Sequence, residues 1–348
     1  MSWPRWRKLF DLPYSKNTPV SVTSQQGGPM VKDLFSQFRL TLSGGHQKAG
    51  TLTGGALCTE TPHSLIKSLF VKLNGQQLLE IPGTDLRVVH LISNSKDVQF
   101  TPTVATTDVT TSFRAVYNFD FQTRLADFAR RTFLAANRYD VVEFGVQWGS
   151  EASLHSGAYA TTHAVTAATK IEVEAETWTG IADFHARTNP SNGTMAPVQY
   201  WHRRFQRTTF GITATQKAYE MAIPLGETLA RLYLKEYTDA SDFETPVNNI
   251  IDAAGAVEIW FNGNERKFQF TKDKLDELAN DDYRLGIGTA TALPTGYHVI
   301  DFMRDRDFAN AMRTDAGSGM AKVSLIADVT TASNAKLRML SETLVPSR

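Results

Sequence analysis

Apolar and polar side chains alternate along many short segments of the chain. Phe38, Leu40 and Leu42 alternate with polar neighbours, and residues 142–148 and 170–178 follow the same rule. Because successive side chains of a β-strand point to opposite faces, this alternation places one face of each strand in a core and the other in water. Such alternation is typical of antiparallel sheets. The chain is therefore predicted to be all-β.

Two of these alternating stretches contain the signature of a tight hairpin. Asn74-Gly75 lies between two alternating runs, and Asn262-Gly263 lies in the same setting in the second half. Asn-Gly favours a type I′ turn, which needs a positive φ at both central residues and joins two antiparallel strands. The two turns are 262 − 74 = 188 residues apart. The hairpin is thus the first sign of an internal repeat.

Further segments recur after the hairpin, in the same order in both halves. They are a strand that leads into a helix, followed by two alternating strands: residues 117–121, 142–148 and 170–178 in the first half, and residues 297–302, 323–329 and 336–344 in the second. Any two β-sandwiches share hairpins and alternation, but three correspondences in one order favour duplication. We therefore predict two β-sandwiches in tandem.

Short helices are expected in the connections between strands. One is expected near residues 84–86 and its counterpart near residues 273–275, each after a hairpin and a turn. Apolar residues spaced three and four positions apart predict two more, at residues 125–133 and 308–312.

The length of 348 residues exceeds what one hydrophobic core usually supports, so two domains are expected. Turn-forming residues between Arg187 and Pro197 predict a linker between them. We expect an N-terminal arm over residues 1–28, a first sandwich over 29–186, a linker over 187–200 and a second sandwich over 201–348.

Charge and cysteine content narrow the classes of function. Lysine plus arginine (36) equals aspartate plus glutamate (36), so the chain has no net field to attract nucleic acid or an anionic membrane. Cys58 is the only cysteine, which excludes an internal disulfide and fits a reducing compartment. No apolar run approaches the ~20 residues of a membrane span. A polar stretch follows residues 1–10 where a signal peptide would be apolar.

The common motifs of catalysis are missing from the sequence. The eight histidines are His46, His63, His90, His155, His163, His185, His202 and His298. No two of them form the His-x-His pair that a bicupin, a duplicated β-sandwich enzyme, uses to hold its metal. His155 and His163 are interpreted as solvated loop residues. No nucleophile elbow or phosphate-binding glycine loop occurs. We therefore expect no enzymatic activity, no cofactor and no catalytic, cofactor-binding or metal-binding residue.

This layout resembles the double jelly-roll major capsid proteins of tailless icosahedral viruses, especially bacteriophages with an internal membrane. The resemblance covers residues 30–345 and rests on the hairpin, the strand-to-helix unit and the two closing strands of each half. It implies two tandem eight-stranded jelly-roll β-sandwiches per chain and three chains per capsomer. Six jelly rolls then give a pseudo-hexagonal outline that tiles an icosahedral shell around the genome.

The resemblance also implies partners and a location. The chain is expected to bind itself, first as a homotrimer and then in the capsid lattice, and to meet penton and minor capsid proteins and the lipid of an internal membrane. No specific recognition of nucleic acid is expected, because the only dense basic cluster is the short one near the N-terminus. The protein is expected in the virion capsid after assembly in the host cytoplasm.

The family places its N-terminal segment toward the interior of the virion. The matching segment carries Trp3, Arg5, Trp6, Arg7 and Lys8. Tryptophan rings and cations together suit the headgroup boundary of a membrane, so this segment is a candidate for contact with lipid or the inner face. Packing on a neighbouring subunit and a mobile terminus are the alternatives.

A second candidate contact pairs opposite charges on neighbouring chains. Arg203 and Arg204 belong to a basic, aromatic stretch, whereas Glu172 and Glu174 share one face of a strand. These groups are hypothesised to meet across a contact between subunits. A solvated strand face is the other interpretation of the two glutamates.

Two other functions stay open on the sequence. A receptor- or carbohydrate-binding jelly roll, such as a viral spike or minor capsid protein, would present its loop tips to a ligand. A bicupin-like metalloenzyme with an unusual ligand set is the less favoured alternative.

Overall fold

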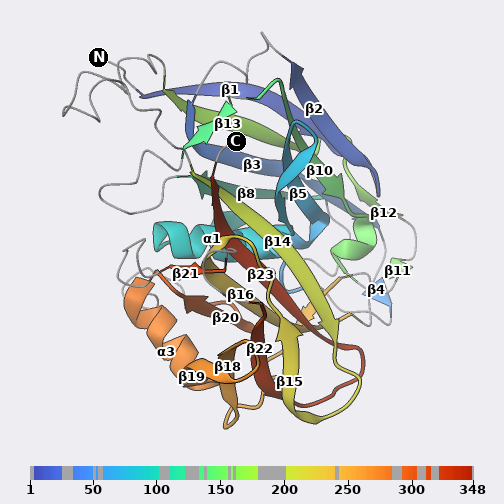
Figure 1. The fold of residues 1–348 in the computed structure, drawn as a ribbon. Helices are drawn as coiled ribbons and strands as arrows, with labels where there is room; N and C mark the ends of the chain where they lie inside the picture. The colour runs from blue at the N-terminus through green and yellow to red at the C-terminus, as the bar shows by residue number, and fades with distance from the viewer. Residues whose placement is uncertain are drawn as a thin grey trace, which may run out of the picture.

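The strands form two β-sandwiches, one from each half of the chain, in the computed structural model (Figure 1). In Figure 1 the first sandwich, in blue and green, lies above the second, in yellow to red, with helix α1 near their junction. The structure describes residues 4–25, 34–49, 52–53, 58–101, 110–121, 133–136, 139–155, 158–159, 162–178, 201–239, 243–283, 292–303, 311–314 and 321–346.

Within the described residues the first sandwich is a jelly roll of eight main strands, to which β7 adds a short ninth. One sheet has the order β1-β13-β3-β8, with β7 added beyond β8, and the other has the order β2-β10-β5-β6. The strands are β1 (Pro4–Pro13), β2 (Pro19–Gln25), β3 (Leu34–Ala49), β5 (Ile66–Leu73), β6 (Gln76–Ile81), β7 (Gln99–Thr101), β8 (Thr110–Asp120), β10 (Val141–Trp148) and β13 (Lys170–Trp178).

The second sandwich repeats this arrangement strand for strand. Its sheets have the orders β14-β23-β16-β20 and β15-β22-β18-β19. The strands are β14 (Trp201–Gly211), β15 (Gln216–Ala222), β16 (Thr228–Thr238), β18 (Ala256–Phe261), β19 (Glu265–Thr271), β20 (Tyr297–Asp301), β22 (Val323–Val329) and β23 (Ala335–Pro346). The predicted duplication is confirmed, because every segment matched between the halves occupies the equivalent place in its sheet.

Short elements fill the connections between the main strands. They are β4 (Leu52–Thr53), β9 (Leu134–Ala135), β11 (Ala158–Tyr159), β12 (Thr162–Val165), β17 (Thr245–Pro246), β21 (Met312–Arg313) and the 3₁₀ turns His63–Leu65 and Glu151–Ser153.

Both Asn-Gly hairpins form where the sequence predicts them. Asn74 and Gly75 have φ values of 47° and 80°, and Asn262 and Gly263 have 52° and 74°. The first turn is the two-residue loop between β5 and β6. The second includes one more residue, Asn264, before β19 begins. Positive φ at both central positions explains why Asn-Gly stands at each turn.

The two hairpin asparagines also bond to the next strand of their sheets in the same way. The backbone nitrogen of Asn74 donates to the carbonyl of Val141 (2.8 Å), and its Oδ1 accepts from the Val141 nitrogen (2.9 Å). The nitrogen of Asn262 donates to the carbonyl of Lys322 (2.8 Å), and its Oδ1 accepts from Ala321 (2.8 Å). These matching contacts support a common plan for both halves.

The helices expected after the hairpins are confirmed as α1 (Gly83–Asn94) and α3 (Lys272–Tyr283). Of the other two expected helices, one falls mainly on residues 122–132, which lie outside the described residues. The other was predicted to reach Met312. Met312 instead belongs to β21, where it pairs with Leu229 of β16, because sheet pairing outweighs the local helical spacing.

The N-terminal segment is part of the first jelly roll. We expected an arm over residues 1–28, but β1 pairs with β13 and β2 pairs with β10, so the two segments complete the two sheets. The basic and aromatic residues of β1 interrupt its alternation, and both strands are at sheet edges. The linker predicted over residues 187–200 lies outside the described residues, so its boundaries stay a prediction.

The hydrophobic core of the first jelly roll continues into the second. Inside the first sandwich Phe38 packs edge-on against Phe144, with ring centroids 5.4 Å apart. The same apolar cluster includes Phe205, Tyr233 and Tyr297 of the second half. A second cluster fills the interior of the other sandwich. Shared apolar burial therefore joins the two jelly rolls.

Candidate functional site

The junction between the jelly rolls contains buried charges. Lys235 on β16 is 1% exposed, and its Nζ lies 2.6 Å from Glu60 of the first half and 2.8 Å from Glu244 of the second. The ammonium also donates to Thr84 Oγ1 at 3.3 Å. A buried ammonium needs such partners, because an unpaired charge in a core costs several kcal/mol.

Arg338 on β23 makes the second link across the junction. Its guanidinium donates to Asp85 at 2.5 Å and to Thr84 at 3.2 Å, both in the first turn of α1, and it forms an ion pair with Glu244. The hydroxyl of Tyr297 also donates to Asp85, at 2.8 Å. The start of α1 is thus bonded to three side chains of the second jelly roll, those of Lys235, Tyr297 and Arg338.

The pKa values of these groups follow from burial and pairing. Burial alone would lower the pKa of Lys235, but the carboxylates of Glu60 and Glu244 outweigh it and raise that pKa. Burial would raise the pKa of Glu244, but Arg338 and Lys235 lower it well below its usual range. For Glu60 burial prevails over Lys235 and raises the pKa. Of the two carboxylates that contact Lys235, Glu60 is therefore the first to accept a proton on acidification.

Arg203 contributes a third link, and its position corrects one prediction. We expected Arg203 to contact Glu172 or Glu174 of another chain. Instead it is 2% exposed, pairs with Glu342 at 2.7 Å and donates to the carbonyl of Asp120 at the end of β8. Its place on β14, which packs against the first jelly roll, turns the side chain inward. Arg203 therefore joins the two halves of one chain.

Glu172 and Glu174 lie on the outer face of β13 and are bonded to cations of their own chain. Lys8 Nζ lies 2.7 Å from Glu172, and Arg39 lies 3.9 Å from Glu174. Each glutamate side chain keeps about a third of its surface exposed, 32% in both cases. Contact of these glutamates with a neighbouring subunit stays a prediction.

The aromatic and basic N-terminal residues lie along β1, at the edge of this sheet. Arg5, Trp6 and Lys8 are exposed and Arg7 is partly buried, whereas Trp3 lies outside the described residues. The guanidinium of Arg39 lies 4.7 Å from the centroid of the Trp6 ring. The exposed side chains share an edge that another surface could reach, and contact with lipid or a neighbouring chain stays a prediction.

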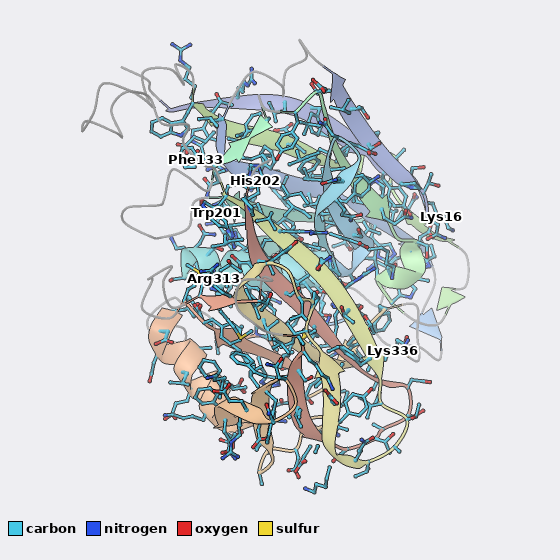
Figure 2. All side chains as sticks on the ribbon, viewed as in Figure 1. Lys16, Phe133, Trp201, His202, Arg313 and Lys336 are labelled. Carbon is cyan, nitrogen blue, oxygen red and sulfur yellow. The ribbon has the colours of Figure 1, made fainter. Side chains whose placement is uncertain are left out.

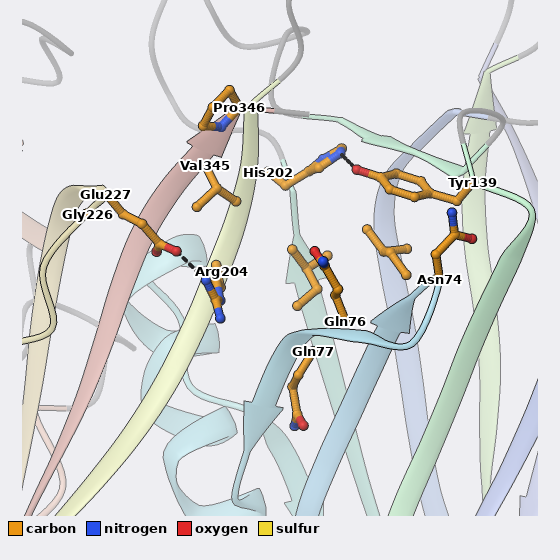
Figure 3. Close-up of a pocket in the computed structure, with 12 residues that line it drawn as sticks. Asn74, Gln76, Gln77, Tyr139, His202, Arg204, Gly226, Glu227, Val345 and Pro346 are labelled. Carbon is orange, nitrogen blue, oxygen red and sulfur yellow. Dashed lines mark hydrogen bonds and ion pairs between the residues drawn. The ribbon is translucent and has the colours of Figure 1, made fainter. Parts of the chain in front are cut away.

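A cleft of about 690 Å³ opens beside the junction (Figure 3). Gln76 and Gln77 of the first hairpin form one side, and Arg204, paired with Glu227, forms the other. His202 closes one end, with its Nε2 2.9 Å from the hydroxyl of Tyr139. Figure 2 places His202 and Trp201 near the level where the two jelly rolls meet. Arg204 is thus accessible to a partner, unlike Arg203.

One cluster was missed by reasoning from the sequence. His46, His155 and His163 lie together at one end of the first jelly roll, with ring nitrogens within 4.8 Å of one another. His155 is 1% exposed, which corrects its interpretation as a solvated loop residue. His46 is distant in sequence from the other two, and the pairing of β12 with β3, together with the packing of the turn Glu151–Ser153 beside β12, brings the three together. The sequence offers no local spacing that could have predicted the cluster.

No family model and no curated protein matches the amino-acid sequence. Within the residues that the structure describes, no helix is long and apolar enough to cross a membrane.

Solved structures resemble the chain over almost its whole length. The major capsid protein of STIV, the Sulfolobus turreted icosahedral virus, gives a TM-score of 0.72 at 11% identity, covering 99% of this chain and 97% of that one. The major capsid protein P2 of bacteriophage PM2 gives 0.61 at 13% identity, covering 99% and 98%. The PBCV-1 virus capsid gives 0.63 at 12% identity, covering 99% and 94%. The chain therefore has the double jelly-roll fold of these viral capsid proteins, as the sequence predicted.

Proposed function

We propose that the chain is a viral major capsid protein, which assembles as trimeric capsomers of pseudo-hexagonal outline and tiles an icosahedral shell around a genome. The observation that carries this proposal is the pairing of two jelly rolls with the same strand order in one chain. Three such chains around a threefold axis place six similar bodies in a ring. The fold shared with the STIV and PM2 capsid proteins supports the same function.

The junction suits this function because a capsomer needs a subunit of fixed shape. Two sandwiches joined only by a linker would change their relative orientation, and the six-part outline would be lost. Here Lys235, Arg338 and Arg203 each bond to groups of the other half, next to shared apolar packing. The chain can therefore act as one rigid building block.

In this proposal the chain is a structural protein without a catalytic step. Its main partner is itself, as a homotrimer and then in the lattice. Penton and minor capsid proteins, and the lipid of an internal membrane, are its further partners in the virion, and assembly takes place in the host cytoplasm. Arg204 beside the cleft and the exposed edge of β1 are the surfaces that we assign to contacts with neighbouring chains or lipid.

Electron microscopy of the purified chain tests this function. Class averages viewed down the symmetry axis should show one particle type with six lobes and threefold symmetry. Isolated two-lobed particles at every protein concentration would contradict the proposal and would favour a receptor- or carbohydrate-binding jelly roll. Glycan-array binding would then test that alternative directly.

A further inference from the structure

Three histidines from three segments meet at one end of the first jelly roll. His46 lies near the end of β3, His163 lies on β12, and His155 follows the 3₁₀ turn Glu151–Ser153. The antiparallel pairing of β12 with β3 places His46 opposite Val165 and brings His163 into the same region. The cluster therefore lies where the connection after β3 meets the connection before β13.

The rings are packed closely enough to share one ion. The centroids of His155 and His163 are 3.8 Å apart, and those of His46 and His163 are 4.8 Å apart. One nitrogen from each ring lies within 4.8 Å of the others. Zinc–nitrogen bonds of about 2.0–2.1 Å put two tetrahedral ligand atoms about 3.4 Å apart. The longest separation must therefore close by at most about 1.4 Å, which ring rotation can supply.

The three possible ligand atoms are imidazole nitrogens. His46 and His155 are 2% and 1% exposed, so two of the three rings are removed from water. Imidazole is a common ligand of zinc and of neighbouring transition metals.

Charged groups near the cluster come from β3, from the turn between β1 and β2, and from the 3₁₀ turn Glu151–Ser153. Lys48 on β3 acts on both His46 and His163, and Lys16 acts on His163. Glu151 opposes these cations and is paired with Lys16 at 2.8 Å. One carboxylate therefore offsets part of the positive charge that an ion would meet.

We propose that His46, His155 and His163 bind one divalent transition-metal ion, with Zn²⁺ as the best fit to three imidazoles. The ion would connect the end of β3, through His46, to the connection between β10 and β13, through His155 and His163. Three nitrogen ligands suit Zn²⁺ and neighbouring transition metals, whereas Mg²⁺ and Ca²⁺ prefer oxygen. The site would stabilise one end of the subunit, and it is independent of the proposed function.

Calorimetric titration of the chain with Zn²⁺ tests this site. The protein carries no polyhistidine tag and is first stripped with chelator. The wild-type chain should bind one Zn²⁺ and show a higher melting temperature with the ion than without it. His163→Gln and His155→Gln each remove a ligand, so each should weaken binding by more than the ~10-fold that loss of a ligand's outer hydrogen-bond partner already costs. Gln47→Ala, an exposed neighbour of His46, is the matched control and should bind like wild type.

His163 is the partly exposed member of the cluster, so His163→Gln is the variant that best keeps the fold. Its melting temperature without metal checks that fold before titration. Absence of saturable Zn²⁺ binding by the wild-type chain would overturn the proposal, as would equal binding by a folded His163→Gln variant. Equal binding of Mg²⁺ would also overturn it. The three rings would then serve only as packing between two loops.

Discussion

Buried charged residues form several of the contacts between the two jelly rolls. Arg338 and Asp85 are each 2% exposed in their side chains, so the pair is removed from water. A buried pair adds little stability compared with apolar packing, but removal of one partner leaves the other charge without compensation. Loss of a buried arginine should therefore cost much more stability than loss of an exposed one.

Arg338→Met should therefore destabilise the protein strongly. The variant leaves Asp85 and Glu244 without their guanidinium partner, and such losses cost about 3–5 kcal/mol. Arg39→Met is the matched control, because Arg39 is 45% exposed and lies 3.9 Å from Glu174. The control should cost less than about 1 kcal/mol. Urea denaturation measures both, and equal losses would contradict this account of the junction.

His63 gives a pH dependence at the residue scale. Its Nδ1 lies 2.6 Å from the hydroxyl of Tyr117, and burial, aided by the charge of Arg87, lowers its pKa to about 3. The unfolded chain takes up this proton near pH 6.5 and the folded chain does not. The stability that His63 contributes is thus present above pH 6.5 and is lost as the pH falls.

Between pH 7 and pH 5 this loss should reach about 2 kcal/mol for His63. His63→Gln cannot titrate and should lose about that much less stability over the same interval, as measured by urea denaturation at both pH values. His298 has a raised pKa and acts in the opposite direction, but it is present in both proteins. An identical pH dependence of the two proteins would show that His63 is not held neutral.

At the scale of elements, the hairpin between β5 and β6 depends on the backbone of its turn. Gly75 has a φ of +80°, and a Cβ added there would meet nothing within 4 Å. Any cost of a side chain at this position is therefore conformational rather than steric. Gly211, at the end of β14, also has open space around it but no positive φ. A comparison of the two glycines therefore isolates the cost of the positive φ.

Gly75→Ala should destabilise the protein by about 1–2 kcal/mol, the usual cost of the left-handed region for a residue with a Cβ. Gly211→Ala should leave stability unchanged or slightly higher, because alanine restricts the unfolded chain. Thermal unfolding of both variants makes the comparison. A neutral Gly75→Ala would mean that the turn does not need a positive φ there.

Elements with strong alternation could be predicted from the sequence, and weaker ones could not. Strands β10 and β13 and both hairpins lie where the pattern indicates, because each buries one face in a core. The pattern of β1 was misleading. A basic, aromatic segment can form either a free arm or an edge strand, because both leave its charged side chains in water. Only the pairing of β1 with β13, which local sequence does not reveal, distinguishes the two.

The candidate sites depend on long-range contacts, which explains what the sequence could and could not indicate. Nothing local marks Arg203 as buried and Arg204 as accessible, since that difference arises from the packing of β14 against the first jelly roll. The histidine cluster likewise depends on residues 46 and 163 meeting through a strand pair. Internal repetition, by contrast, is a property of the sequence itself.

At the scale of the whole molecule, two jelly rolls of one plan form a single body. Apolar packing around Phe205 and the links made by Lys235 and Arg338 cross between the halves. This body gives each chain two similar parts at fixed positions. A threefold assembly of such chains has the near-hexagonal outline that a closed lattice requires.

The native mass of the purified chain tests this central claim most directly. Light scattering at several concentrations should give a particle near 3 × 38.6 = 115.8 kDa, or larger shells built from it. A particle that stays at 38.6 kDa at every concentration would contradict the trimeric capsomer.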